Sequence, residues 1–290
     1  MSERKLTPIV ESHNVEEEYL YAKPYIFIKG FASNGKFIYT LKALPLARKF
    51  HNGQYRKGLV EVNGKMVKLP YILHCLKVCS TLISLGLPLS NEDLDILYAS
   101  ALLHDSLEDA EEYFPKGGIE LVNEYGFPKE VYNIVKLLSK HAGSDEYELN
   151  EYFNNIKKNR LALLIKLADR SHNVEDLYSM KIEKLHKYVN ETRTYIYALA
   201  KYAKESYPEL SNGVTILKAK IVSLTELTET LVEMHEEIMK DKNSEIEALK
   251  KEIEDLKKRW EIIFFLLLKL NKNKFKKLCD IFVYYLITYI

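Results

Sequence analysis

The adjacent histidine and aspartate at positions 104 and 105 are the strongest sign of chemistry in this sequence. Glu108 and Asp109 follow them, in a stretch whose other residues predict an apolar helix. Charged side chains are seldom buried unless they are paired or bind an ion, so four ionisable groups within six residues are costly in a helix that only packs. The segment therefore indicates a site for something cationic.

Two more segments supply metal-ligating side chains. The full candidate set is His74, His104, Asp105 and Asp169. Two imidazoles and two carboxylates suit Mn²⁺, Fe²⁺ or Zn²⁺, with coordination positions left for water. His104 and Asp105 diverge by about 100° on a helix, but they can converge on an ion lying between their helix and two others. Glu108 and Asp109 lie one turn further along, where a carboxylate can orient water or take its proton.

Each of these residues has a simpler interpretation when taken alone. A His-Asp pair in a helix is more often a hydrogen-bonded pair, and Asp169-Arg170 is more often a salt bridge. A lone histidine on an apolar face, such as His74, is more often a satisfied core residue. The metal site is favoured because all three elements occur together, on consecutive predicted helices, in the order His, His-Asp, Asp.

The elements that must position these residues are mostly helices. Apolar residues recur at helical spacing between Phe37 and Asn52, and further helices are predicted at about 71–86, 91–109, 116–124, 128–140, 145–156, 159–178 and 181–206. Ser90 is a plausible N-cap. In residues 59–69, apolar and polar residues alternate on both sides of Asn63-Gly64, which is the strongest short-range signal for a β-hairpin. We therefore predict an all-α helical bundle with a small β-hairpin insertion.

We divide the chain into an N-terminal extension (1–37), a catalytic domain (38–208) and a helical extension (209–290). In the last part, apolar residues from Leu224 to Ile238 and from Ile246 to Ile263 follow 3-4 spacing on either side of the polar residues 240–244. This pattern predicts a coiled coil and a homo-oligomer, although long helices folded back on the domain remain an alternative. The apolar runs at 262–268 and 281–290 are each shorter than the roughly 20 residues that span a bilayer. Membrane-surface contact and a buried helical pair both stay open.

Composition narrows the functional class. The chain has 290 residues, 47% of them hydrophobic and 29% charged, as in soluble globular proteins. With a net charge of +1 it has no global field to attract a nucleic-acid polymer, so a phosphorylated ligand must be recognised locally. Cys75, Cys79 and Cys279 form no disulfide or zinc framework, and the charged start resembles no signal peptide. We expect a cytoplasmic protein.

The order His, His-Asp, Asp is the signature of the HD phosphohydrolase superfamily, an all-helical, metal-dependent fold. Four segments closely resemble the hydrolase domain of RelA/SpoT-type alarmone enzymes: 47–57 (ARKFHNGQYRK), 70–74 (PYILH), 101–109 (ALLHDSLED) and 165–173 (IKLADRSHN). The resemblance covers about residues 40–206. No α/β pattern like that of the nucleotide-synthesising domain of long alarmone enzymes follows it, so the chain is similar to the small alarmone hydrolases.

The resemblance implies a role for each matching residue. The implied Mn²⁺ ligands are His74, His104, Asp105 and Asp169, and the implied water-activating pair is Glu108 and Asp109. Arg56 and Lys57 would line the nucleotide pocket and Asn173 would contact the sugar region. Lys166 would assist, or would extend to solvent. One departure is that Val-Glu-Asp176 follows Asn173, where long bacterial enzymes tend to have Met-Arg-Thr.

The resemblance implies a Mn²⁺-dependent hydrolase of guanosine 3′,5′-bispyrophosphate (ppGpp) that releases pyrophosphate from the 3′ position; another divalent metal is an alternative. A second interpretation keeps the site and changes the substrate, for example to the 2′-phosphate of NADPH or to another nucleotide. A third is a coiled-coil scaffold or membrane-tethered adaptor with a relict HD fold. Intact candidate ligands favour the enzyme.

Overall fold

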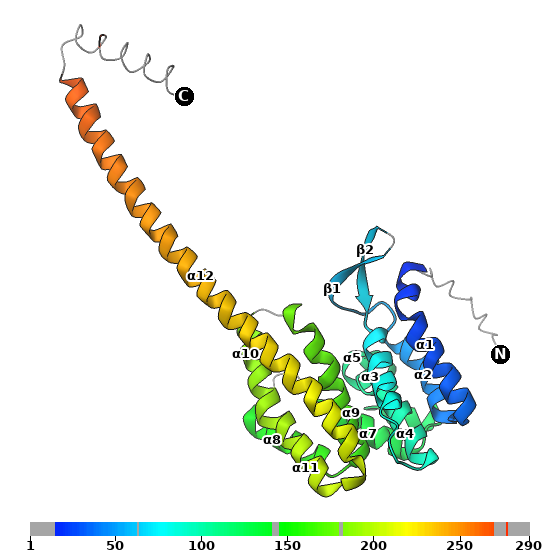
Figure 1. Cartoon of the computed structure of the whole chain (residues 1–290). Coiled ribbons are helices and arrows are strands. Elements are labelled where there is room, and N and C mark those ends of the chain that lie inside the picture. Colours follow the sequence, from blue (N-terminus) through cyan, green and yellow to red (C-terminus); the bar gives the residue numbers. More distant parts are fainter. Residues whose placement is uncertain (1–14, 63, 141–144, 180–181, 270–276, 278–290) are drawn as a thin grey trace. The chain divides into compact units, whose positions relative to one another are not determined.

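The computed structural model describes residues 15–62, 64–140, 145–179, 182–269 and 277. These residues are mostly helical, and the β structure among them is one two-stranded antiparallel hairpin (Figure 1). The all-α prediction with a small hairpin insertion is therefore confirmed. The chain divides into two compact units, Met1–Glu229 and Thr230–Ile290, and all the candidate site residues lie in the first.

The helices and strands that matter for the site follow in chain order. They are α1 (Val15–Gly35), α2 (Ile38–Phe50), β1 (Tyr55–Val62), β2 (Lys65–Pro70), α3 (Ile72–Ser84), α4 (Asn91–Leu103), α5 (Ser106–Asp109), α6 (Glu120–Asn123), α7 (Lys129–Leu138), α8 (Glu146–Lys157), α9 (Arg160–Asn173), α10 (Ile182–Glu191), α11 (Tyr197–Ser206) and α12 (Ser211–Leu268). Short 3₁₀ or π segments join several of them.

Three helices form the centre of the first unit. α3, α4 and α9 all pack against one another, with α2 and α7 against α4 and with α8 against α9 (Figure 1). Every residue of α4 from Asp95 to Leu103 is buried, as expected for a helix surrounded by others. The Ser90 side chain accepts a hydrogen bond from the Asp93 N–H, so the predicted N-cap is confirmed. The Asn159 side chain caps α9 in the same way.

The start of α2 is capped by another helix. Its own N-cap residue, Phe37, makes no side-chain capping bond. Instead the buried carboxylate of Asp95, on α4, accepts hydrogen bonds from the backbone N–H groups of Tyr39 (2.9 Å) and Thr40 (2.7 Å). A carboxylate at this end also complements the positive end of the helix dipole. Asp95 thus fixes α2 on α4.

The structure corrects the sequence-based elements in four places. α1 was not predicted, because Pro24 and weak periodicity obscure it, yet its Ile28 and Ala32 are fully buried. The helix predicted over 91–109 ends at Leu103 and resumes as α5, because Asp105 has ψ −2° and turns the chain out of the helix axis. The helix predicted over 181–206 contains a π-helical turn at Thr192–Ile196. The polar residues 240–244 do not interrupt α12, since none is Gly or Pro.

The hairpin matches its prediction closely. β1 and β2 pair antiparallel, with Val62 opposite Lys65 across the turn at Gly64 (φ +76°). The pairing is irregular between Tyr55 and Leu59, where Gly58 has φ +107°. Such irregularities redirect side chains, and Arg56 lies within this one.

Among the helices described, none is long and apolar enough to cross a bilayer.

Candidate metal centre

The central helices bring the four candidate ligands together. His74 lies on α3, His104 and Asp105 lie between α4 and α5, and Asp169 lies on α9. The Nε2 atom of His74 is 3.3 Å from Nε2 of His104 and 3.2 Å from Oδ1 of Asp169. The Nε2 atom of His104 is 3.0 Å from Oδ2 of Asp105. His74, His104 and Asp105 thus form a cluster of converging ligand atoms, with Asp169 beside it.

The donor set fits a divalent ion. Nitrogen and oxygen ligands lie about 2.0–2.2 Å from such an ion, so neighbouring donors around it are separated by roughly 3 to 3.5 Å. Most of the distances in the cluster lie in this range, and the longest, from His104 Nε2 to Asp169 Oδ1, is 3.9 Å. Two imidazoles and two carboxylates are the borderline-hard donors expected for Mn²⁺, Fe²⁺ or Zn²⁺.

Hydrogen bonds outside the cluster orient its ligands. The Nδ1 atom of His104 lies 2.8 Å from the carbonyl oxygen of Ala101, so it donates there and the Nε2 atom faces the cluster. The hydroxyl of Tyr71 donates to Oδ2 of Asp105 at 2.8 Å. Orientation by second partners of this kind is usual for metal ligands.

The ionisable groups of the cluster shift one another's pKa. Burial alone would raise the pKa of Asp105 and of Asp169, but neighbouring cationic groups hold both well below the usual range. Burial alone would lower the pKa of His104, but the two carboxylates raise it to about 9. Both carboxylates are thus held as anions, as metal ligands must be.

Asp169 is held by two polar neighbours from its own helix. The ammonium of Lys166 lies 3.1 Å from Oδ2, and the amide of Asn173 donates to Oδ1 at 2.5 Å. Burial would lower the pKa of Lys166, but Tyr152 and Asp169 raise it. Lys166 therefore stays charged beside the cluster instead of extending to solvent, and Asn173 contacts a candidate ligand directly.

Glu108 and Asp109 follow the cluster on α5. Both side chains reach solvent, yet the protein packed around them partly buries them and raises the pKa of each carboxyl. Glu108 accepts a hydrogen bond from the backbone N–H of Lys140, which fixes its carboxylate. The side chain of Gln54 donates to the backbone carbonyl of Asp109. A carboxylate with a raised pKa is better matched to accept a proton near neutral pH.

The two adjacent basic residues of the hairpin, Arg56 and Lys57, have different surroundings in the structure. Arg56 donates to Oδ1 of Asn173 at 2.8 Å and pairs with Asp176 at 3.2 Å, so its guanidinium lies beside the cluster. Lys57 is exposed on β1. Asp176, where the chain departs from long alarmone enzymes, is therefore the residue that pairs with Arg56.

Sequence reasoning gave no role to two residues that contact the ligands. Tyr71 bonds Asp105, and the Nδ1 atom of His172 lies 2.5 Å from Nδ1 of His74. The surroundings of His172, led by burial and then by the charge of His74, lower its pKa to about 2, so it is neutral. Tyr71 and His172 each lie in the same sequence motif as a candidate ligand. That position in the sequence was the one feature that could have indicated a role for them.

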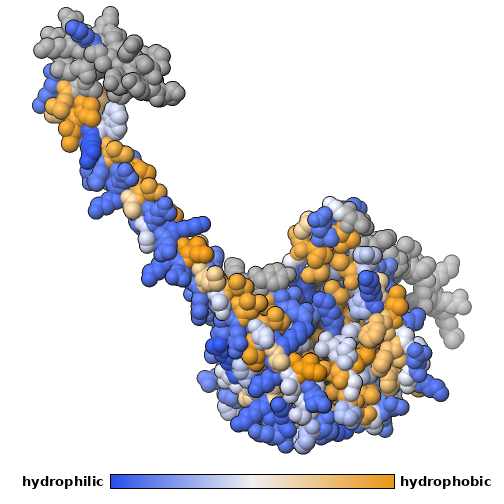
Figure 2. All heavy atoms as spheres, viewed as in Figure 1, coloured by the Kyte–Doolittle hydropathy of each residue, from blue (hydrophilic) through white to orange (hydrophobic). Residues whose placement is uncertain are grey.

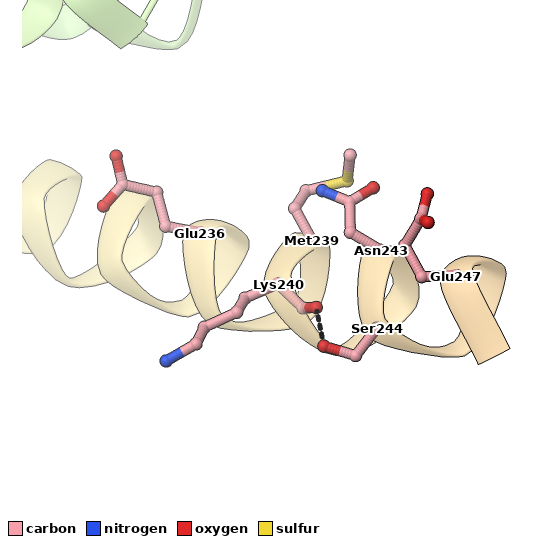
Figure 3. Close-up of a pocket in the computed structure, with 6 residues that line it drawn as sticks. All are labelled: Glu236, Met239, Lys240, Asn243, Ser244 and Glu247. Atoms are coloured by element: carbon pink, nitrogen blue, oxygen red, sulfur yellow. Dashed lines mark hydrogen bonds between the residues drawn. The ribbon is translucent and has the colours of Figure 1, made fainter.

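One pocket lies outside this centre. A shallow pocket on the part of α12 in the second unit is lined by Glu236, Met239, Lys240, Asn243, Ser244 and Glu247, which Figure 3 draws. All six residues come from one helix. None is a candidate ligand, so the pocket is not part of the metal centre.

Comparison with known proteins agrees with this geometry. Residues 71–174 match the HD domain family, a segment that contains all four candidate ligands. The chain is 33% identical to a guanosine-3′,5′-bis(diphosphate) 3′-pyrophosphohydrolase of Aquifex aeolicus over 52% of its length, and 33% identical to one of Haemophilus influenzae over 51%. It is 26% identical, over 69% of its length, to a putative chloroplastic GTP diphosphokinase of Oryza sativa subsp. japonica. The chain spans about a fifth of the length of these relatives, 19% to 22%.

Proposed function

We propose, from the premise that residues 71–174 form a RelA/SpoT-like HD domain, that this chain is a Mn²⁺-dependent guanosine-3′,5′-bis(diphosphate) 3′-pyrophosphohydrolase. The observation that carries the proposal is the convergence of His74, His104, Asp105 and Asp169 next to two carboxylates with raised pKa. Relatives with hydrolase names and others with diphosphokinase names match the chain. The metal cluster favours hydrolysis, because the reaction needs an activated water and the cluster is built beside two candidate bases.

The reaction adds water across the bond between the 3′ oxygen and phosphorus. The water oxygen joins phosphorus, the 3′ oxygen keeps the electron pair of the broken bond and gains a proton, and pyrophosphate departs. A divalent ion held by the four ligands would lower the pKa of water and offset the negative charge of the phosphoryl oxygens.

The side chains around the cluster orient the water, accept its proton and bind the phosphate. Glu108 and Asp109 orient the attacking water and accept its proton, which their raised pKa favours. Arg56 binds a phosphate group, since a guanidinium forms paired hydrogen bonds with phosphate oxygens. Asn173 and Asp176 hold Arg56 in place until the substrate binds.

The test uses the full chain stripped of metal with a chelator and then given Mn²⁺. Guanosine 3′,5′-bispyrophosphate should yield GDP and pyrophosphate only after Mn²⁺ is added, whereas NADPH should release little 2′-phosphate. Asp169→Ala should lose bound metal and turnover together, because a charged ligand is removed; Glu151→Ala, at an exposed carboxylate, is the control. Full turnover by Asp169→Ala would refute the metal assignment, and release of phosphate from NADPH alone would refute the substrate.

A further inference from the structure

The second unit carries a row of large apolar side chains along one side of α12. The row consists of Ile246, Leu249, Ile253, Leu256, Trp260 and Ile263, and each side chain is 44% to 54% exposed. Figure 2 shows hydrophobic residues along this helix, beside hydrophilic ones. Spacings of three and four residues keep the row on one face of a helix. A face of this size left in water is a site of association.

The row continues toward the N-terminus with a shift of one residue. Leu231 and Ile238 are seven residues apart, and so are Met239 and Ile246; all four are exposed. The adjacent Ile238 and Met239 therefore belong to two successive registers, and the helix stays continuous between them. Figure 3 shows this part of α12, where the Ser244 hydroxyl donates to the carbonyl oxygen of Lys240. One extra residue changes the local supercoil without ending the apolar face.

The side chains in the row indicate the number and direction of helices. With Ile246 and Ile253 at the first position of each heptad and Leu249 and Leu256 at the fourth, the row has β-branched residues and leucines in alternation. This order favours two parallel strands over trimers or tetramers, because isoleucine packs well at the first position of a parallel pair and leucine at the fourth. The side chains of the row therefore favour packing against one parallel helix that carries a matching row.

The charged residues beside the row indicate which helix can pair with it. In a parallel, in-register pair, Glu245 lies opposite Lys250 of the partner subunit, and Glu252 lies opposite Lys257 of the partner subunit. In an antiparallel pair of the same helices, glutamate would face glutamate and lysine would face lysine. Within one chain, Lys250 also contacts Glu247 at 2.7 Å, an exposed i,i+3 pair that contributes little.

We propose that the apolar row of α12 binds the same row of a second copy of this chain, forming a parallel, in-register, two-stranded coiled coil. A bilayer surface is the other apolar partner to consider. Helices that lie on membranes carry mainly lysine and arginine beside the apolar face. This row has Lys250 and Lys257 on one side but Glu245 and Glu252 on the other, and the glutamates would repel anionic lipid. The second copy supplies a lysine for each of them.

Charge reversal tests the pairing in the full-length chain. We expect the natural chain to sediment as a dimer. E245K/E252K and K250E/K257E should each weaken dimerisation about 100-fold, because four Glu–Lys pairs per dimer become like-charge pairs. An equimolar mixture of the two variants should dimerise again, since unlike charges then face each other. E247K/E254K is the matched control. It makes the same change of charge as E245K/E252K, but at heptad positions that point away from the partner helix, so this variant should remain dimeric.

Cross-linking tests direction and register. L249C, in a background where Cys279 is replaced by Ser, should form an intermolecular disulfide under mild oxidation, because equivalent residues at this position meet only in a parallel, in-register pair. Cys75 and Cys79 are buried and do not compete. A monomeric natural chain, a trimer, unchanged dimerisation in both reversal variants, or binding of the monomer to anionic vesicles would each overturn the proposal. So would failure of L249C to cross-link in a chain that still dimerises. None of these readouts depends on hydrolysis.

Discussion

Asp169 shows how single residues are held in place in the candidate metal centre. It is buried, its Oδ1 atom faces His74, and its own helix supplies the ammonium of Lys166 and the amide of Asn173. Asn173 in turn accepts a hydrogen bond from Arg56. One continuous set of bonds therefore connects a candidate metal ligand with a candidate phosphate-binding group, so both are positioned before substrate arrives.

Glu108→Gln separates proton transfer from metal binding. The amide keeps the shape of the side chain, and its oxygen can still accept the N–H of Lys140, but it cannot take a proton. We expect kcat to fall on the order of 100-fold while the metal content per chain is unchanged. Metal analysis and steady-state kinetics on one preparation measure both. If the metal content fell and the rate per bound ion did not, Glu108 would be a ligand.

Arg56 and Lys57 form a natural matched pair. Arg56 bonds Asn173 beside the cluster, whereas its neighbour Lys57 is exposed. Arg56→Ala should raise KM for the phosphorylated nucleotide at least about 10-fold, because a charge-assisted bond to phosphate is lost. Lys57→Ala should change KM less than about threefold. Equal effects of the two substitutions would show that the hairpin moves on binding and that both residues reach the ligand.

The cluster of His74, His104, Asp105 and Asp169 could be predicted from the sequence because each of these residues stands in a motif of fixed order. Their nearest polar neighbours could not. His172 reaches His74 across 98 residues and Arg56 reaches Asn173 across 117, and both contacts depend on how α3, α9 and the hairpin pack. Local spacing holds no information on such contacts. The exposure of Lys57 depends likewise on an irregular strand pairing, which no pattern of apolar residues reveals.

At the scale of elements, the contact between α4 and α2 offers a direct test of stability. Asp95→Ala leaves the buried N–H group of Thr40 and the partly buried N–H group of Tyr39 without their acceptor. A buried donor left unsatisfied costs about 1–3 kcal/mol and a partly buried one costs less, so the free energy of unfolding should fall by roughly 2–5 kcal/mol. Urea unfolding followed by circular dichroism measures the loss. Asp95→Asn retains an acceptor oxygen and should lose less than half as much; an equal loss would mean that the charge, not the hydrogen bonds, holds α2.

Element types could be predicted better than element ends. Apolar periodicity indicated α2, α3 and α7 within a few residues, since each has a buried face and an exposed one. It also indicated α9, although that helix is buried on nearly all sides. It did not indicate the end of α4 before His104, because the apolar pattern continues while the backbone turns at Asp105. That turn places His104 and Asp105 between two helices, where both can face the same point.

At the scale of the whole molecule, α12 belongs to two units. Its first part is built into the first unit, where Val214, Leu217 and Ile221 are buried and Arg193 pairs with Glu229. Beyond Thr230 most of its large apolar residues are exposed. The boundaries predicted after residues 37 and 208 stay predictions. Burial places the last residues that support the first unit close to Glu229.

Two truncations test this division. A chain ending at Glu229 keeps every residue of α12 whose burial is described and found complete, so it should fold, hydrolyse the substrate at the rate per site of the full chain, and sediment as a monomer. A chain ending at Leu210 loses Val214, Leu217 and Ile221, each worth about 1.5–3 kcal/mol when buried. The sum, roughly 5–9 kcal/mol, is comparable to the whole stability of an ordinary domain, so this shorter chain should be unfolded or insoluble.

Circular dichroism and sedimentation velocity distinguish the outcomes of the two truncations. A folded, active chain ending at Leu210 would show that α12 is dispensable for the first unit, and a dimeric chain ending at Glu229 would place the association outside the apolar row.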